Sequence, residues 1–220
     1  RRINRPEIKV ITIEDPVEYQ LEGLSQTQVD SMKGYTFASG LRSIMRQDPD
    51  VILIGEIRDI ETAEIALQAA LTGHLVFSTL HTNDAAGALT RLVDMGVEPF
   101  LVASSVIVVS AQRLARKICL QCKEPFVISK EVREKIDFKL PENVQFYFGK
   151  GCEACGGTGY KGRMSITEVL EVDIPVREMI LLGKTSDQIK NYAHSNGKLV
   201  TLFEDAMDKC PEAASLAPAG

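Results

Sequence analysis

Several features that would assign a chain to a common functional class are missing from this 220-residue sequence. No apolar run reaches the roughly 20 residues needed to cross a bilayer, and the longest mostly apolar stretch, residues 100–111, contains serines. The basic residues at the start of the sequence are not followed by an apolar segment, so no secretory signal peptide is expected. The formal net charge of −5 gives no overall basic field for nucleic acid. These absences predict a cytosolic protein without a transmembrane segment and without a nucleic-acid partner.

A phosphate-binding loop is also missing from the sequence. The pattern G-x-x-x-x-G-K-[ST] does not occur, so no cradle for a triphosphate is visible. Internal repeats and heptad arrays are not found either. The composition is otherwise ordinary for a soluble globular protein, with 45% hydrophobic and 25% charged residues. The length suits one large domain, or a domain with an appendage.

Two short runs rich in β-branched residues each lead into acidic residues. Residues 51–54 (Val-Ile-Leu-Ile) are typical of a strand buried on both faces of a parallel sheet, although a buried helix has the same pattern. Glu56 follows this run, and Glu14 follows residues 8–13 in the same way. Because open α/β sheets bind ligands at the carboxyl ends of strands, both carboxylates are candidates for polarising water or holding Mg²⁺. The alternative is ordinary charged turns after core strands.

Segments with helical spacing alternate with segments of strand composition, which is typical of an α/β domain. Residues 99–114 are apolar and are interpreted as a helix. The other expected elements are helices that begin at Thr36, span residues 60–72, run from Asn83 or Asp84 to about Met95 and recur within residues 164–209, and a strand at residues 75–80.

Two histidines bracket the strand expected at residues 75–80. His74 and His81 lie at its opposite ends, so they cannot both reach one site at the carboxyl edge of the sheet. His81 shares that edge with Glu14 and Glu56, and a γ-phosphate sensor or a polarising group is a suitable role for it. His74 is expected at a subunit contact or without a functional role. A surface or satisfied core histidine is the common alternative for either residue.

Four of the five cysteines form two C-x2-C pairs, which are separated by residues 123–151. In a cytosolic chain this usage indicates metal binding or redox chemistry before disulfides. Four thiolates suit tetrahedral Zn²⁺ and leave no open coordination position, so the predicted metal is structural. Four unrelated thiols, or a redox pair, are the alternatives. The predicted zinc ligands are Cys119, Cys122, Cys152 and Cys155.

Changes in composition predict four segments along the chain. Residues 1–118 form the α/β core, residues 119–163 the four-cysteine subdomain and residues 164–209 a helical region. Residues 210–220, which include the fifth cysteine, are expected to be a disordered tail.

Four motifs, in order, resemble those of the secretion ATPases of type II secretion systems and type IV pilus assembly. Residues 11–19 resemble the family's Asp box, residues 41–59 its Walker B region and residues 71–86 its His box. The two cysteine pairs resemble its tetracysteine element, which favours the assembly and secretion branch over the pilus-retraction branch. The similarity extends from residue 8 to about residue 208.

The resemblance implies a RecA-like α/β core, a homohexamer, and ATP hydrolysis coupled to movement of an inner-membrane platform protein at the cytoplasmic face of the bacterial inner membrane. It implies that Glu56 is the general base or water-orienting carboxylate and that Glu14 supports Mg²⁺ or the attacking water. It also implies that His81 contacts the γ-phosphate region. Arg58 is a further candidate for ATP binding, and with Arg42 and Arg46 it is a candidate for charge neutralisation or a subunit contact.

In that family the phosphate-binding loop precedes the Asp box. The chain therefore resembles the C-terminal portion of such an ATPase, and we expect it not to hydrolyse ATP on its own. The alternative function is a non-catalytic, zinc-stabilised protein-binding module, because the second cysteine pair and its glycines are similar to the zinc knuckles of certain chaperones. Such a module would not explain acids at the ends of two strands.

Overall fold

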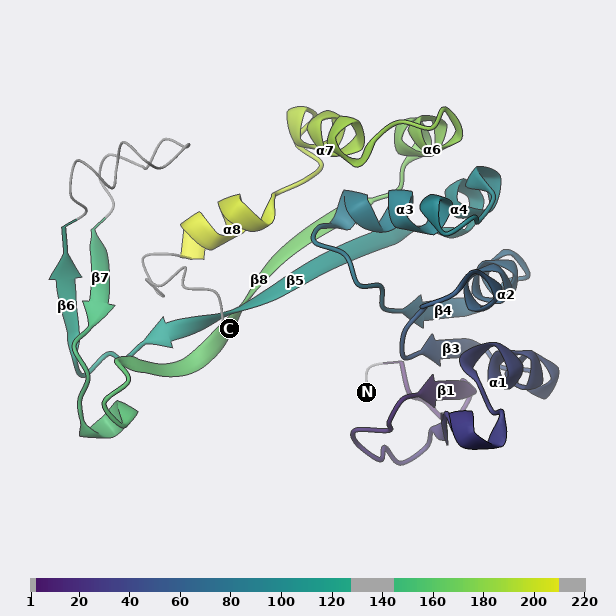
Figure 1. Ribbon diagram of the computed structural model, residues 1–220, viewed down its shortest axis with the longest axis horizontal. Coiled ribbons are helices and arrows are strands. Elements are labelled where there is room, and N and C mark those ends of the chain that lie inside the picture. The colour runs from purple at the N-terminus through teal and green to yellow at the C-terminus, as the bar shows by residue number, and fades with distance from the viewer. Residues whose placement is uncertain (1–2, 128–144, 210–220) are drawn as a thin grey trace. The chain divides into compact units, whose positions relative to one another are not determined.

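The computed structural model describes residues 3–127 and 145–209 (Figure 1). The chain divides into two compact units, of which the first comprises residues 1–109 and 170–198 and the second comprises residues 110–169 and 199–220. Within the described ranges, no helix is long and apolar enough to span a bilayer. The expected tail, with Cys210, lies outside these ranges.

A four-stranded parallel sheet lies at the centre of the first unit, with the strand order β2-β1-β3-β4. The pairing aligns Ile13 with Ile54 and Ile54 with Ser78, so the carboxyl ends of β1, β3 and β4 lie at one edge. This arrangement confirms the predicted strands and their common direction. The strands are β1 (Val10–Glu14), β2 (Ser25–Gln28), β3 (Val51–Ile54) and β4 (Leu75–Ser78).

The two middle strands form the core of this sheet, whereas β4 is exposed. Ile13 and Ile54 have no exposed surface, and neighbouring residues on both faces of β1 and β3 are also buried. This burial explains the continuous apolar run in β3, which periodicity alone could not distinguish from a helix. On β4, by contrast, Leu75 is 43% exposed and Phe77 is 42% exposed. In the part of the chain that the structure describes, β4 pairs only with β3.

Helices α1 and α2 cover one face of the sheet, because α1 packs on β1, α2 packs on β4 and the two helices contact each other (Figure 1). Three predicted helix starts are confirmed by side-chain caps, with Thr36 before α1, Asp59 before α2 and Asp84 before α3. The helices of this unit are α1 (Phe37–Ile44), α2 (Ile60–Leu71), α3 (Ala85–Asp94), α4 (Pro99–Ser105), α6 (Ile174–Leu181) and α7 (Ser186–Ser195), with short 3₁₀ turns at η1 (Ser31–Lys33) and η2 (Met45–Gln47).

The expected helix at residues 99–114 is wrong in its second half. Helix α4 ends at Ser105, and residues 108–118 form strand β5. Four consecutive β-branched residues at positions 106–109 lower helix propensity. Pairing with β8 in a separate two-stranded sheet then supplies the hydrogen bonds of an extended backbone. The start of the expected helical region, residues 164–171, likewise belongs to β8.

In its described residues, 110–127, 145–169 and 199–209, the second unit is built from strands, a short cysteine-rich turn and helix α8. Its small core consists of Ala115, Ile166 and Ala206, with Met164 and Leu202 packed against them. Residues 110–118 and 164–169 belong to this compact unit together with the described part of the cysteine segment. Its described elements are most of β5 (Val108–Ile118) and of β8 (Tyr160–Glu171), which both extend into the first unit, with β6 (Lys123–Phe126), β7 (Phe146–Gly149), η3 (Glu153–Cys155) and α8 (Leu202–Lys209).

Candidate nucleotide site and four-cysteine cluster

Three side chains meet just beyond the carboxyl ends of β3 and β4. Oε1 of Glu56 lies 2.5 Å from Nη2 of Arg58, and Oε2 of Glu56 lies 2.9 Å from Nε2 of His81. The Glu56 side chain is only 13% exposed, while Arg58 is 60% and His81 is 86% exposed. Both oxygens of a nearly covered carboxylate are thus held by groups that remain accessible to solvent.

The backbone beyond the strands holds this site in register. The N–H of Gly55 donates to the carbonyl of Ile13 at 2.8 Å, and the hydroxyl of Thr79 donates to the carbonyl of Gly55 at 2.6 Å. The N–H of Ile57 then donates to the carbonyl of Thr79 at 3.0 Å. A Cβ on Gly55 would lie 3.3 Å from Cα of Glu14, which is tighter than most real contacts. Glycine at this position therefore permits the close approach of the two acid-bearing segments.

Electrostatics favour the ionised form of Glu56. The hydrogen bond from Arg58 is the main cause that lowers the pKa of the Glu56 carboxyl below its ordinary value, and the contact with His81 lowers it further. Partial burial of the carboxyl acts in the opposite direction but does not outweigh these contacts. The carboxyl is therefore ionised at neutral pH, where it can bind a cation or orient a water molecule.

Glu14 lies at the same edge of the sheet, but its carboxylate has different partners. Its Oε1 accepts hydrogen bonds from the hydroxyl of Thr12 at 2.5 Å and from Nε2 of Gln26 at 3.1 Å. No hydrogen bond or ion pair joins Glu14 to Glu56 or His81 within residues 3–127 and 145–209. The structure thus brings together Glu56, Arg58 and His81 by direct contact, and brings Glu14 to the same edge by backbone register alone.

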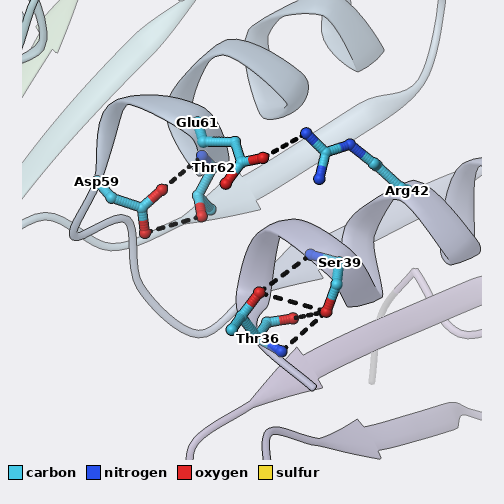
Figure 2. Close-up of polar contacts among 6 residues, drawn as sticks. All are labelled: Thr36, Ser39, Arg42, Asp59, Glu61 and Thr62. Atoms are coloured by element: carbon cyan, nitrogen blue, oxygen red, sulfur yellow. Dashed lines mark hydrogen bonds and ion pairs between the residues drawn. The ribbon is translucent and has the colours of Figure 1, made fainter. Parts of the chain in front are cut away.

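The N-terminal ends of α1 and α2 lie at this edge and are closed by their own side chains (Figure 2). Thr36 and Ser39 cap α1 reciprocally, since each backbone N–H donates to the hydroxyl of the other residue. At the start of α2, Oδ1 of Asp59 accepts from the N–H of Thr62 at 2.8 Å. The cap on α2 fixes that helix immediately next to the candidate site, because Asp59 directly follows Arg58.

The remaining candidate residues have structural contacts. Arg42 forms an ion pair with Glu61 and so links α1 to the first turn of α2 (Figure 2). Arg46 donates to the hydroxyl of Ser43 at 3.5 Å. Nδ1 of His74 lies 2.9 Å from the carbonyl of Ala69 at the last turn of α2. His74 therefore lies at the opposite end of β4 from His81, as expected.

The four cysteines of the two C-x2-C pairs converge in the second unit, with all Sγ atoms within 4.8 Å of one another. The measured separations are 3.8 Å for Cys119 and Cys152, 3.9 Å for Cys122 and Cys155, and 3.7 Å for Cys152 and Cys155. A tetrahedral site with metal–sulfur bonds of about 2.3 Å has sulfur–sulfur edges of about 3.8 Å. The donor set therefore fits a tetrahedral cation such as Zn²⁺.

Backbone groups around the second cysteine pair stabilise a thiolate. The N–H groups of Cys152 and Gly159 each lie 3.2 Å from Sγ of Cys155. The hydrogen bond from Cys152 is the main cause that lowers the pKa of Cys155 to about 6, whereas burial raises the pKa of Cys122 to about 12. Gly159 has a φ of +77°, and a Cβ there would lie 2.3 Å from the carbonyl oxygen of Gly149. Glycine is therefore required where this loop crosses the end of β7.

The functional contact that sequence reasoning missed is the pair of donors to Glu14. Thr12 precedes Glu14 by two positions and so lies on the same face of β1, which the sequence alone could have indicated. Gln26 lies on another strand, and its approach depends on the pairing of β1 with β2.

The parallel sheet places the first unit in the class of open α/β proteins, and the carboxylate–imidazole contact lies at the edge where such folds commonly bind ligands. The family model described as Type II/IV secretion system protein matches residues 1–217. The chain belongs to this family. The resemblance expected from the four motifs is thereby confirmed.

Curated relatives include "Type IV pilus assembly ATPase PilB" of Thermus thermophilus, which is 51% identical over 95% of this chain and 24% of its own length. Another is "Type II secretion system ATPase E" of Vibrio cholerae, which is 48% identical over 95% of this chain and 41% of its own length. The chain thus spans between about a quarter and two fifths of the lengths of these relatives.

Two solved structures share the fold. The X-ray structure of the Legionella pneumophila ATPase DotB aligns with a TM-score of 0.63 at 24% identity, and covers 95% of this chain and 49% of that chain. The crystal structure of the pilus retraction motor PilT with bound ADP aligns with a TM-score of 0.55 at 30% identity, and covers 96% of this chain and 53% of that chain. Both support the predicted α/β fold.

Proposed function

We propose that this chain is part of an ATPase that couples ATP hydrolysis to type II protein secretion or type IV pilus assembly. The observation that carries the proposal is the Glu56 carboxylate, which is held between Arg58 and His81 at the carboxyl edge of a parallel sheet. The names of both curated relatives and the ADP in the crystal of PilT support a nucleotide as the ligand.

In this proposal Glu56 orients the attacking water and accepts its proton. A low pKa keeps the carboxyl ionised, and its small exposed fraction limits competing solvent. His81 contacts the γ-phosphate region, and exposed Arg58 neutralises developing phosphate charge. Each oxygen of Glu56 has one partner in this structure and keeps a further lone pair with which it could accept from the attacking water.

Mg²⁺ fits the same edge, because Glu14 and Glu56 supply the carboxylate oxygens that this cation prefers. Bound with the nucleotide, Mg²⁺ would neutralise charge on the phosphates. The sequence contains no phosphate-binding loop, so hydrolysis would require such a loop from residues outside it. We therefore expect the isolated chain to be inactive. The exposed β4, which leads to His81 at its carboxyl end, is where a further strand could bring that loop.

The four cysteines would hold one structural Zn²⁺ in the second unit. Their sulfur separations match a closed tetrahedral site, in which no position remains for a substrate. The ion would stabilise the fold of the described residues around the cysteines, 119–127 and 145–163.

The partners in this proposal follow from the relationship to secretion and pilus ATPases. We propose a homohexamer that acts on an inner-membrane platform protein, together with cytoplasmic components of the secretion or pilus machinery. The protein would then lie at the cytoplasmic face of the bacterial inner membrane.

Substitution of the proposed base tests the function. In the natural protein that carries this sequence, Glu56→Gln should lower the turnover of ATP by about 10² to 10⁴-fold and leave nucleotide binding intact. Glu7→Gln is the matched control, because Glu7 is exposed and lies before β1, away from the carboxyl edge. Unchanged hydrolysis in Glu56→Gln, measured as phosphate release, would refute the role of Glu56.

A further inference from the structure

Gln26 on β2 uses its side-chain amide to join three separate groups. Its Oε1 accepts a hydrogen bond from the N–H of Leu21 at 2.7 Å, and its Nε2 donates to the carbonyl of Tyr19 at 3.0 Å. The same Nε2 donates to Oε1 of Glu14 at 3.1 Å. Both amide hydrogens and the amide oxygen thus have partners, so the side chain can adopt only one orientation.

Strand pairing fixes the place from which Gln26 reaches Glu14. Gln26 is the register partner of Thr12, so both residues lie on the face of the sheet that carries Glu14, two positions further along β1. Thr12 is 2% exposed and donates to the same Oε1 atom. Two rigidly placed donors therefore converge on one oxygen of the Glu14 carboxylate.

The second oxygen of Glu14 is left for a ligand. Among residues that the structure describes, Oε2 of Glu14 has no hydrogen-bonding partner, whereas both oxygens of Glu56 are engaged. Donors on one oxygen set the plane of a carboxylate and the direction of its other oxygen, as partners of metal ligands commonly do.

We propose that Gln26 is a positioning residue for Glu14, which it orients so that Oε2 of Glu14 can bind Mg²⁺ or the attacking water. This inference rests on the proposed function, in which Glu14 supports that cation or water. Gln26 also ties residues 19–21 to the end of β1, so the loop after Glu14 and the carboxylate itself share one anchor.

Gln28 provides a control within the same strand. Its Oε1 accepts from the N–H of Val17 at 3.3 Å, so it also anchors the loop after β1. In the described part of the chain it makes no side-chain hydrogen bond to Glu14. Truncation of either glutamine removes a loop contact, but only truncation of Gln26 removes a donor from Glu14.

The contact itself is tested by thermal melting of four forms of the natural protein: wild type, Glu14→Gln, Gln26→Glu and the double variant. In the wild-type background Gln26→Glu places two carboxylates together and should lower the Tm by about 2–4 °C. In the Glu14→Gln background the amide of residue 14 can donate to the new carboxylate, so the same substitution should cost less. An equal loss of Tm in both backgrounds would overturn the proposed contact.

Steady-state ATP hydrolysis tests the positioning role. Gln26→Ala should lower kcat by about 10 to 100-fold with little change in KM for ATP, because orientation and not nucleotide affinity is lost. Gln28→Ala should retain the wild-type kcat. Equal kcat values for Gln26→Ala and Gln28→Ala, with a large loss in Glu14→Gln, would overturn the role of Gln26 and leave the proposed function standing. Full activity of Glu14→Gln would overturn the roles of both residues.

Discussion

The imidazole of His81 lies 2.9 Å from the carboxylate of Glu56, although 25 positions separate the two residues in the chain. The parallel pairing of β3 with β4 produces this contact, since the two residues extend beyond the same ends of adjacent strands. An imidazole so placed sets the direction of one carboxylate oxygen, and Arg58 sets the direction of the other. The pKa of Glu56, the binding of Zn²⁺ by the four cysteines and the stability that the cap on α2 provides can each be measured separately.

Removal of the guanidinium beside Glu56 should raise the pKa of that carboxyl. The hydrogen bond from Arg58 is the largest cause of its lowered pKa, so Arg58→Ala should make Glu56 titrate at higher pH. Carboxyl ¹³C chemical shifts followed by NMR during a pH titration would measure this change. Arg42→Ala is the control, because Arg42 pairs with Glu61 at the same edge. A Glu56 titration that is the same in Arg58→Ala and wild type would contradict the prediction.

The same ion pair predicts the sign of a pH effect on stability. The pKa of Glu56 is lower in the folded state than in the unfolded state, where it is about 4.3. The ionised carboxyl therefore stabilises the folded protein at pH values above the unfolded pKa. This stabilisation is lost as the pH falls through the folded pKa. The difference in unfolding free energy between wild type and Arg58→Ala should therefore be present at pH 7 and shrink on acidification. Urea denaturation at pH 7 and at pH 4 would show whether it does.

Chelation of the predicted Zn²⁺ should loosen the cysteine segment at an earlier time than it loosens the parallel sheet. Metal-binding free energy is folding free energy in such elements, and the four sulfurs join β5, β6, η3 and the turn before β8. Hydrogen exchange after treatment with a chelator should therefore accelerate first at amides of residues 145–163, while β1 and β3 keep their protection.

Metal analysis supplies the control for that experiment. The wild-type protein should contain one Zn²⁺ per chain, and Cys152→Ser should lose it because a neutral hydroxyl is a poor substitute for a thiolate. Cys210→Ser should retain the ion, since Cys210 lies outside both cysteine pairs. A wild-type protein purified with no bound metal that also fails to bind added Zn²⁺ would eliminate the metal site.

Loss of the cap on α2 should destabilise the first unit. Asp59 accepts from the N–H of Thr62 at 2.8 Å and from its hydroxyl at 3.1 Å, and Thr62 is completely buried (Figure 2). Asp59→Ala leaves both donors unpaired and should lower the unfolding free energy by about 1–2 kcal/mol. Asp59→Asn keeps an acceptor oxygen and should cost less, as measured by urea denaturation. Equal losses in the two variants would mean that an acceptor oxygen at position 59 does not account for the stabilisation.

Local patterns predicted most elements of the first unit correctly. The β-branched run before Glu56 forms β3, and Thr36, Asp59 and Asp84 cap the helices at or next to the expected starts. These features depend on neighbours in the chain, which is why the sequence reveals them. The interpretation of residues 99–114 as one helix is wrong beyond Ser105, because a mostly apolar stretch does not distinguish a helix from a strand whose partner is far away in the chain.

The sequence by itself determined that acids follow two β-rich segments, that His81 follows a third, and that four cysteines come in two knuckle-like pairs, because residue order and spacing are local properties. Only the tertiary structure decided which donors hold each carboxylate. Arg58 and His81 hold Glu56, and Thr12 and Gln26 hold Glu14. The physical reason is that hydrogen bonds of this kind extend over about 3 Å, so strand register and side-chain direction select the partners.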